Sequence, residues 1–246
     1  MQKRRPFETT SASLHIMAMA FMLCDHIWGT LLAGNDWLTC IGRLAFPIFA
    51  FLIVEGYHHT SDFKKYLKRI LIFAVISEIP FNLMHGGYFY PLAQNVLWTF
   101  AISLLIIRFN ERVKERPIWI RMLTALGSVA AAFFLGTFSF CDYGFAGVAT
   151  VLSFYLLRGD RWYHKLFQLV ILWYIHGELL GGLSYVLELP FGEVLLPRQG
   201  FAILALIPIW LYRGKKGSDS KLLRQINYWF YPVHMAVLGI IAMVIA

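Results

Sequence analysis

The sequence predicts an all-α protein: a polytopic bundle of about nine transmembrane helices, with its amino terminus in the cytoplasm and its carboxyl terminus outside. The 246-residue chain is 59% hydrophobic and only 15% charged, with a mean hydropathy of +0.61. That is too apolar for a soluble domain of this size. The apolar stretches are long and unbroken, which is typical of membrane helices and not of outer-membrane barrel strands.

The helices are expected wherever an apolar stretch approaches the length that crosses a bilayer, about 20 residues. The basic start MQKRR, followed by an apolar run without a small-residue cleavage site, predicts an uncleaved first span. The connection 184–198 is the longest loop, and no linker interrupts the chain, so we expect one domain over residues 1–246. The predicted spans are 12–34, 38–59, 66–85, 93–109, 118–140, 144–158, 164–185, 199–213 and 227–245.

The charges between the spans set the orientation. Five basic clusters, MQKRR, KKYLKR, RFNERVKERP, RGDRWYHK and RGKKGSDSKLLRQ, fall on the side of the amino terminus. By the positive-inside rule this side is cytoplasmic. We therefore expect a multi-pass protein of the inner (cytoplasmic) membrane, with membrane lipids as its surroundings. The same distribution explains the net charge of +8 without a nucleic-acid partner.

Polar residues inside the predicted spans gather at two depths. Charged groups within a bilayer usually face a protein interior or a wet cavity. In the outer half, His26 is the expected general base or transient acyl acceptor, with Asp25, Glu78 or Asp142 as its partner. Arg43 or Asn95 is expected to stabilise an oxyanion. The outer site is predicted to comprise the catalytic residues Asp25, His26, Arg43, Glu78 and Asp142, and the substrate-binding residues Asn82, Asn95, Tyr143 and Gln199.

A second group lies at the expected cytoplasmic level. Basic and histidine side chains at a membrane surface suit an anionic ligand such as the phosphates of coenzyme A. The cofactor-binding residues predicted here are Glu55, His58, His59, Arg69, Tyr231 and His234.

Both groups also have structural interpretations. Arg43 and Glu55 are alternatively structural ion pairs, and His26 is alternatively a core histidine that bonds a neighbouring helix. His58 and His59 are adjacent, so their side chains point about 100° apart on a helix and do not share an ion, and no metal is predicted. A disulfide between Cys40 and Cys141, both expected near the outer surface, is left open.

Several motifs together resemble one known family. They are CDHI in the first span, GRLAFPIFAFLIVEGYHHT in the second, KKYLKRILIFAVISEIPFNL in the third, DYGFAGVATVLSFYLLR in the sixth and YWFYPVHM in the ninth. This set resembles the TraX family, named for a conjugative-plasmid protein that acetylates the amino terminus of pilin, within the wider superfamily of transmembrane acyltransferases. The resemblance covers essentially the whole chain.

The resemblance implies an acyl-CoA-dependent acyltransferase. Acetyl-CoA would be the cytosolic donor, and the family's early-span histidine and nearby arginine fall on His26 and Arg43. The acceptor, an amine or hydroxyl of a cell-envelope peptide, glycan or lipid, stays open. A transporter or flippase for a small anionic or proton-coupled solute is the second hypothesis, because the same buried charges suit a relay. A structural scaffold ranks third, because it leaves the buried polar groups unexplained.

Overall fold

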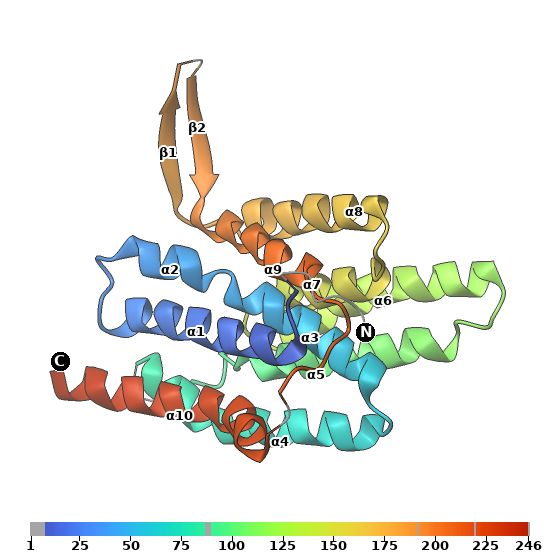
Figure 1. Ribbon diagram of the computed structural model, residues 1–246, viewed down its shortest axis with the longest axis horizontal. Coiled ribbons are helices and arrows are strands. Elements are labelled where there is room, and N and C mark those ends of the chain that lie inside the picture. Colours follow the sequence, from blue (N-terminus) through green and yellow to red (C-terminus); the bar gives the residue numbers. More distant parts are fainter. Residues whose placement is uncertain (1–7, 87–89, 191, 219, 246) are drawn as a thin grey trace.

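The computed structural model describes residues 8–86, 90–190, 192–218 and 220–245 of the protein. It is mostly helical, and every one of the nine predicted apolar stretches coincides with helical structure (Figure 1). The α-helices are α1 (Ser11–Thr30), α2 (Asp36–Gly42), α3 (Ala45–His59), α4 (Phe63–Met84), α5 (Val96–Arg112), α6 (Ile118–Phe138), α7 (Gly144–Leu156), α8 (Trp162–Trp173), α9 (Leu206–Trp210) and α10 (Lys221–Ile245).

Three of the predicted stretches are irregular helices. The second is broken at residues 43 and 44 into α2 and α3, rather than kinked at Pro47. Pro47 instead lies in the first turn of α3. The N–H groups of a first turn have no carbonyl acceptor within the helix, so the N–H that proline lacks costs no hydrogen bond there. The seventh continues from α8 into the π-helix η1 (Tyr174–Leu179), and the eighth joins the 3-10 helix η2 (Arg198–Ala205) to α9.

Within the described residues, three helical segments are long and apolar enough to cross a membrane: Asp36–His59, Ile118–Phe138 and Lys221–Ile245. Two shorter apolar helices are Gly144–Leu156 and Arg198–Trp210. These segments agree with a membrane protein. The count of nine spans and the orientation stay predictions.

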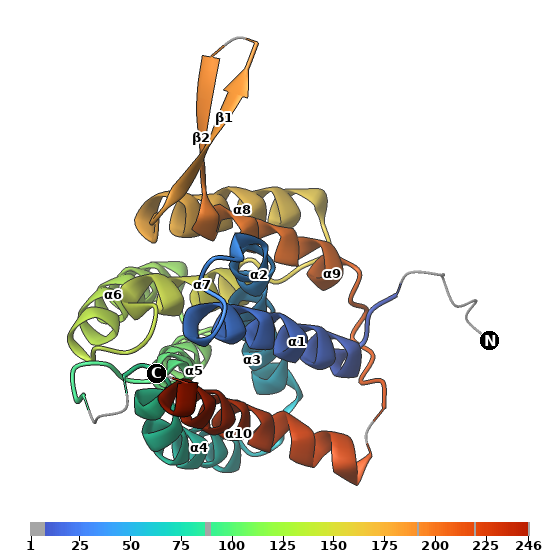
Figure 2. The same cartoon turned by 90° about the vertical axis from the view of Figure 1, so that its left-hand side faces the viewer.

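Helix α3 is the centre of the bundle. It contacts α1, α5, α7, η2 and α9, and 10 of its 15 residues are buried. Figure 2 shows it near the middle, with α8 on one side and α4 and α10 on the other. Its core side chains Ile48 and Val54 pack with residues such as Leu14, Leu104 and Val148. The stretch around residues 40–59 therefore organises the packing.

The connections with basic clusters meet at one end of the bundle, on the right of Figure 1. Arg158, in the connection after α7, forms an ion pair with Glu55 near the end of α3 at 2.8 Å, and Arg213 forms one with Asp160 of that connection at 3.5 Å. Helices α1 and α10 both start at this end and pack side by side. The described connections that carry basic clusters therefore lie at one end of the bundle, whereas the predicted cluster MQKRR lies outside the described residues.

The expectation of purely helical structure is wrong at one place. The connection 184–198, predicted as a loop, contains an antiparallel hairpin of β1 (Ser184–Leu189) and β2 (Gly192–Pro197), with Val186 opposite Leu195 (Figures 1 and 2). The segment SYVLEL is rich in residues that favour strands, and Gly192 adopts a φ of 135° that glycine tolerates at the turn.

The disulfide left open between Cys40 and Cys141 is not formed. All three cysteines are free, and the two lie against different partners. The Cys40 sulfur is 3.4 Å from the Tyr185 hydroxyl, whereas the Cys141 thiol donates to the Gly136 carbonyl.

Candidate active site

A cavity of about 670 Å³ enters the bundle between α1, α3, α4, α5 and α10. Its mouth lies at the end with the basic connections and is lined by Ser11, Glu55, His59, Arg69 and Lys216, among others. The inner end is mostly apolar and is lined by Met22, Val96, Leu97, Phe100 and Tyr231. From Ser11 to Met22 the helix rise amounts to about 17 Å, so the cavity is deep enough for an extended ligand arm.

A pair of histidines lies one helical turn beyond this inner end. His26 follows Met22 by four residues on α1, and His234 follows Phe230 by four on α10, so each lies on the same helix face as a cavity-lining residue. The His26 Nδ1 is 2.7 Å from the His234 Nε2, and the rings stack with their planes 11° apart.

The hydrogen bonds of the pair fix its tautomers. The His234 Nδ1 is 2.6 Å from the Phe230 carbonyl oxygen, which accepts only, so this nitrogen carries the hydrogen. In neutral His234 the Nε2 is then the acceptor, and His26 donates to it from Nδ1. The Nε2 of neutral His26 keeps its lone pair and is the basic atom of the pair.

Asp25 and Arg43 form the second feature of the site. The Asp25 Oδ1 accepts from the Arg43 guanidinium at 2.9 Å and from the Thr39 hydroxyl at 2.7 Å. Arg43 donates to Thr39 from Nε and Nη2, and to the Gln199 Oε1 from Nη1 at 3.1 Å. Four of its five N–H groups are therefore committed. Arg43 holds α1, α2 and η2 together.

The close approach of α1 and α2 depends on Gly42. A Cβ added there would lie 2.4 Å from the Asp25 Cβ, which no real pair of atoms tolerates. The absence of a side chain at Gly42 lets Asp25 reach Arg43.

A buried chain of hydrogen bonds extends from Arg43 to the π-helix. The Gln199 Oε1 accepts from Arg43, so its Nε2 donates to the His176 Nδ1 at 3.2 Å. The His176 Nε2 then donates to the Thr150 hydroxyl at 3.3 Å, which itself donates to the Ala146 carbonyl. His176 and Thr150 are fully buried. π-Helical turns are frequent at functional sites, and this one directs His176 toward Arg43.

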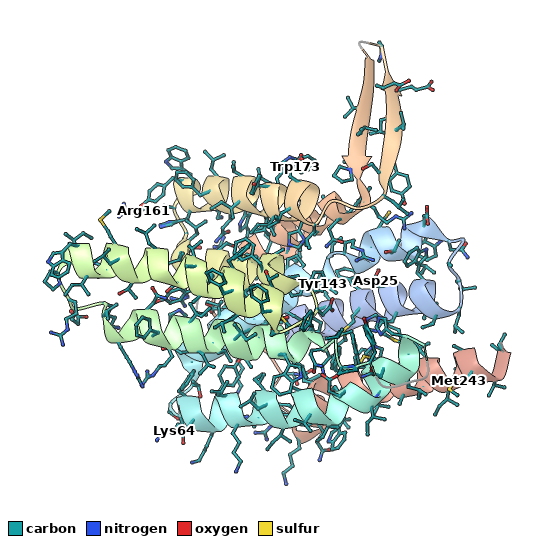
Figure 3. All side chains as sticks on the ribbon, turned by 180° about the vertical axis from the view of Figure 1, so that it is seen from behind. Asp25, Lys64, Tyr143, Arg161, Trp173 and Met243 are labelled. Carbon is teal, nitrogen blue, oxygen red and sulfur yellow. The ribbon has the colours of Figure 1, made fainter. Side chains whose placement is uncertain are left out.

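Asp142 and Tyr143 also belong to the site, and they lie in the connection between α6 and α7. The Asp142 carboxylate accepts from the Tyr143 N–H at 3.0 Å, and its carbonyl accepts from the Thr99 hydroxyl. Tyr143 has a φ of 63°, stacks on Phe46 at 4.0 Å and places its hydroxyl near the Arg43 guanidinium. Figure 3 shows Asp25 and Tyr143 together in the middle of the bundle.

The charge state of Asp142 is set mainly by its burial. Burial raises the pKa of Asp142 to about 6, against the opposing effects of His85 and of the Tyr143 N–H, with Arg43 contributing less. Asp142 therefore changes charge close to neutral pH.

Glu78, Asn82 and Asn95 form a separate network. The Glu78 Oε1 accepts from the Asn95 side chain and from the Trp98 indole N–H at 2.8 Å. The Asn95 side-chain amide also donates to the Ala74 carbonyl, so both of its N–H groups are used. Asn82 donates to the Glu78 carbonyl. These contacts tie α4 to the start of α5, and none of them involves His26.

The residues predicted at the cytoplasmic level divide into two groups. Glu55, His59 and Arg69 line the cavity mouth, where Glu55 pairs with Arg158 and with His59 at 3.4 Å. His58 lies instead against Tyr155, with the rings 6.1 Å apart, away from the cavity.

The structure thus brings most of the predicted outer residues together and changes some assignments. Tyr231 lies at the inner end of the cavity and His234 beside His26, both deeper than the expected cytoplasmic level. His26 is paired with His234 and not with one of the three expected carboxylates. The described residues contain no group of three His, Cys, Asp or Glu that would hold a metal. Residues that the sequence reasoning missed are Thr39, His85, Arg158 and His176; a histidine within an apolar stretch was the available signal for His176.

The helical bundle has apolar segments long enough to cross a membrane, and a cluster of charged and histidine side chains lies in its interior beside a cavity. These features define a helical membrane protein with a polar centre. More particularly, the chain belongs to the TraX family: the family model described as TraX protein matches residues 10–242.

Two curated relatives support this membership. The chain is 28% identical to the probable fimbrial assembly protein FimC, serogroup H1, of Dichelobacter nodosus, over 95% of this chain and 96% of the relative. It is 24% identical to Protein TraX of Escherichia coli, over 92% of this chain and 85% of the relative. No solved structure matches the chain.

Proposed function

We propose that the protein is a membrane-embedded acyltransferase that moves an acetyl group from cytosolic acetyl-CoA to an amine or hydroxyl at the outer face. The observation that carries the proposal is the alignment of the cavity with the histidine pair. The mouth of the cavity is lined by basic side chains, and its inner end lies one helical turn before His26, whose Nε2 is the free basic atom. A donor that enters from one side would meet a general base at the far end.

The cavity suits the parts of coenzyme A. Arg69 and His59 at the mouth would bind phosphates, and the apolar walls would hold the pantetheine arm. The depth of about 17 Å would bring the thioester toward His26.

In the proposed reaction, the His26 Nε2 takes the proton of the acceptor amine or hydroxyl as the acceptor atom bonds to the thioester carbonyl carbon. The tetrahedral intermediate collapses with cleavage of the carbon–sulfur bond, and His26 returns the proton to the leaving sulfur. His234 holds His26 in the required tautomer. Asp25 and Arg43 fix α1 in place, so that His26, the next residue after Asp25, stays aligned.

The proposal includes the membrane arrangement. Nine helical segments would cross the inner membrane with the basic end in the cytoplasm, because the basic connections meet at the cavity mouth. The donor site would then face the cytoplasm and the histidine pair the outer half.

The names of the relatives bear on the acceptor. One relative is called a fimbrial assembly protein and the other is Protein TraX. They support a pilus-associated role, with the amino group of a pilin-like peptide as the first acceptor to test. Glycan and lipid acceptors are the alternatives.

Binding of coenzyme A to the purified protein, measured by calorimetry in detergent, tests the proposal. We expect one site per chain, and charge reversal by Arg69→Glu should weaken binding about tenfold or more. Lys64→Glu is the matched control, because Lys64 lies on the same helix but outside this cavity. Absence of binding to the wild type would contradict the proposal and favour the transporter.

A further inference from the structure

The reaction proposed above develops negative charge on the thioester carbonyl oxygen, and a donor is needed there. The two donors expected from the sequence are otherwise engaged. Arg43 commits four N–H groups to Asp25, Thr39 and Gln199, and Asn95 commits both N–H groups of its side-chain amide to Ala74 and Glu78.

The cavity contains one hydroxyl group at the required depth. Of the hydroxyl-bearing residues in its lining, Ser11, Ser218 and Tyr212 lie toward the mouth, and the Tyr66 hydroxyl donates to the Ile53 carbonyl. Tyr228 lies almost one turn before Tyr231 on α10, nearer the mouth. Tyr231 is at the inner end, and its ring centroid is 6.0 Å from that of His234.

The surroundings of Tyr231 favour negative charge near its hydroxyl group. Tyr231 and Val96 both line the inner end of the cavity. Val96 is the first residue of α5, after the N-cap Asn95, so its N–H has no partner within the helix. Tyr231 thus lies at the positive end of a 17-residue helix, which stabilises a developing negative charge there. The described residues supply no acceptor for the hydrogen of the Tyr231 hydroxyl.

We propose that Tyr231 is a catalytic residue of this site and that its hydroxyl donates a hydrogen bond to the carbonyl oxygen of the acyl thioester. This role rests on the proposed acyl transfer. As the acceptor atom bonds to the carbonyl carbon and His26 takes its proton, the carbonyl π electrons move to oxygen, and the resulting oxyanion accepts from Tyr231. When the carbon–sulfur bond breaks, the carbonyl reforms and Tyr231 keeps its hydrogen. One helix, α10, would therefore carry both the oxyanion donor and the residue that orients the base.

Steady-state kinetics of acetyl transfer with Tyr231→Phe tests the role, because this change removes the hydroxyl and keeps the ring. We expect kcat to fall about 100-fold or more while the KM for acetyl-CoA stays within about threefold. Tyr174→Phe, at an exposed position outside the cavity, removes a hydroxyl from the same residue type, is the control and should retain activity. Coenzyme A binding by Tyr231→Phe, measured by calorimetry, shows that the cavity is intact.

Three outcomes would overturn the role. A kcat within about threefold of the wild type would show that the hydroxyl is not needed. A raised KM with unchanged kcat would assign Tyr231 to donor binding only. A wild type that binds coenzyme A but transfers no acetyl group would remove the proposed function itself, and the role of Tyr231 with it.

Discussion

His26 and His234 are 208 positions apart in the sequence, and their ring nitrogens are 2.7 Å apart in the structure. One histidine lies on the first helix and the other on the last, so the pair forms only when both ends of the chain have packed side by side. The chain from the Phe230 carbonyl through His234 to His26 leaves a single basic atom, the His26 Nε2, without a partner among the described residues.

His234→Phe keeps a ring beside His26 but removes the nitrogen that accepts from its Nδ1. Neutral His26 then has no group that selects its tautomer, and we expect kcat for acetyl transfer to fall about 100-fold. Val233→Phe, at the neighbouring and half-exposed position, should leave kcat unchanged. Equal activity of the two variants would show that His234 does not orient the base.

Gly42→Ala should destabilise the protein by about 1–3 kcal/mol, because the new methyl group cannot fit against Asp25 without moving α2. The matched control is Gly29→Ala, since a Cβ at Gly29 meets no atom within 4 Å. Unfolding in detergent measures both. If the two alanine variants have the same stability, the contact of α1 with α2 is looser than the structure indicates.

The chain from Arg43 to the π-helix predicts coupling between Gln199 and His176. Either alanine substitution alone breaks the hydrogen bond between them, so the double variant should lose less stability than the sum of the single variants. We expect an interaction energy of about 0.5–3 kcal/mol in a double-mutant cycle. Strict additivity would contradict the chain.

Asp142 predicts a pH-dependent stability. Because burial raises its pKa to about 6, the folded state favours the neutral form, and the stability from this group is complete below pH 4 and lost as the pH rises through about 6. Asp142→Asn should therefore stabilise the protein above pH 6, by about 3 kcal/mol at most, and not at pH 4. The exposed Asp160→Asn is the control. A gain that is equal at both pH values would contradict the assignment.

Hydropathy located the helices well, because long apolar runs have few other structures available in a membrane. It could not detect the break before α3 or the π-helix at His176, because both depend on tertiary packing. Hydropathy predicts only a connection between spans at 184–198 and does not predict the hairpin there, although the SYVLEL segment has a strand pattern.

Hydropathy also gives the depth of each polar residue along its span, and this predicts part of the site. Asp25, His26, Arg43 and Gln199 were expected at one depth, and they do lie together. The sequence predicts a last span that begins at residue 227, which places His234 near the cytoplasm. Helix α10 begins at Lys221, so His234 lies midway along it and reaches His26.

Glu78 shows that depth along a span does not by itself predict which residues share a site. It was predicted at the level of His26, but its carboxylate accepts from Asn95 and Trp98 at the start of α5. Depth along a span does not give the direction in which a side chain points, and that direction separates Glu78 from the histidine pair.

The most direct test of the account is transfer of radiolabelled acetyl from acetyl-CoA by the purified protein, with a membrane extract as acceptor. Wild type should transfer label, and His26→Ala should transfer none while remaining folded and binding coenzyme A. Full activity of His26→Ala would contradict the assignment of the base, and absence of transfer by the wild type would contradict acyl transfer itself.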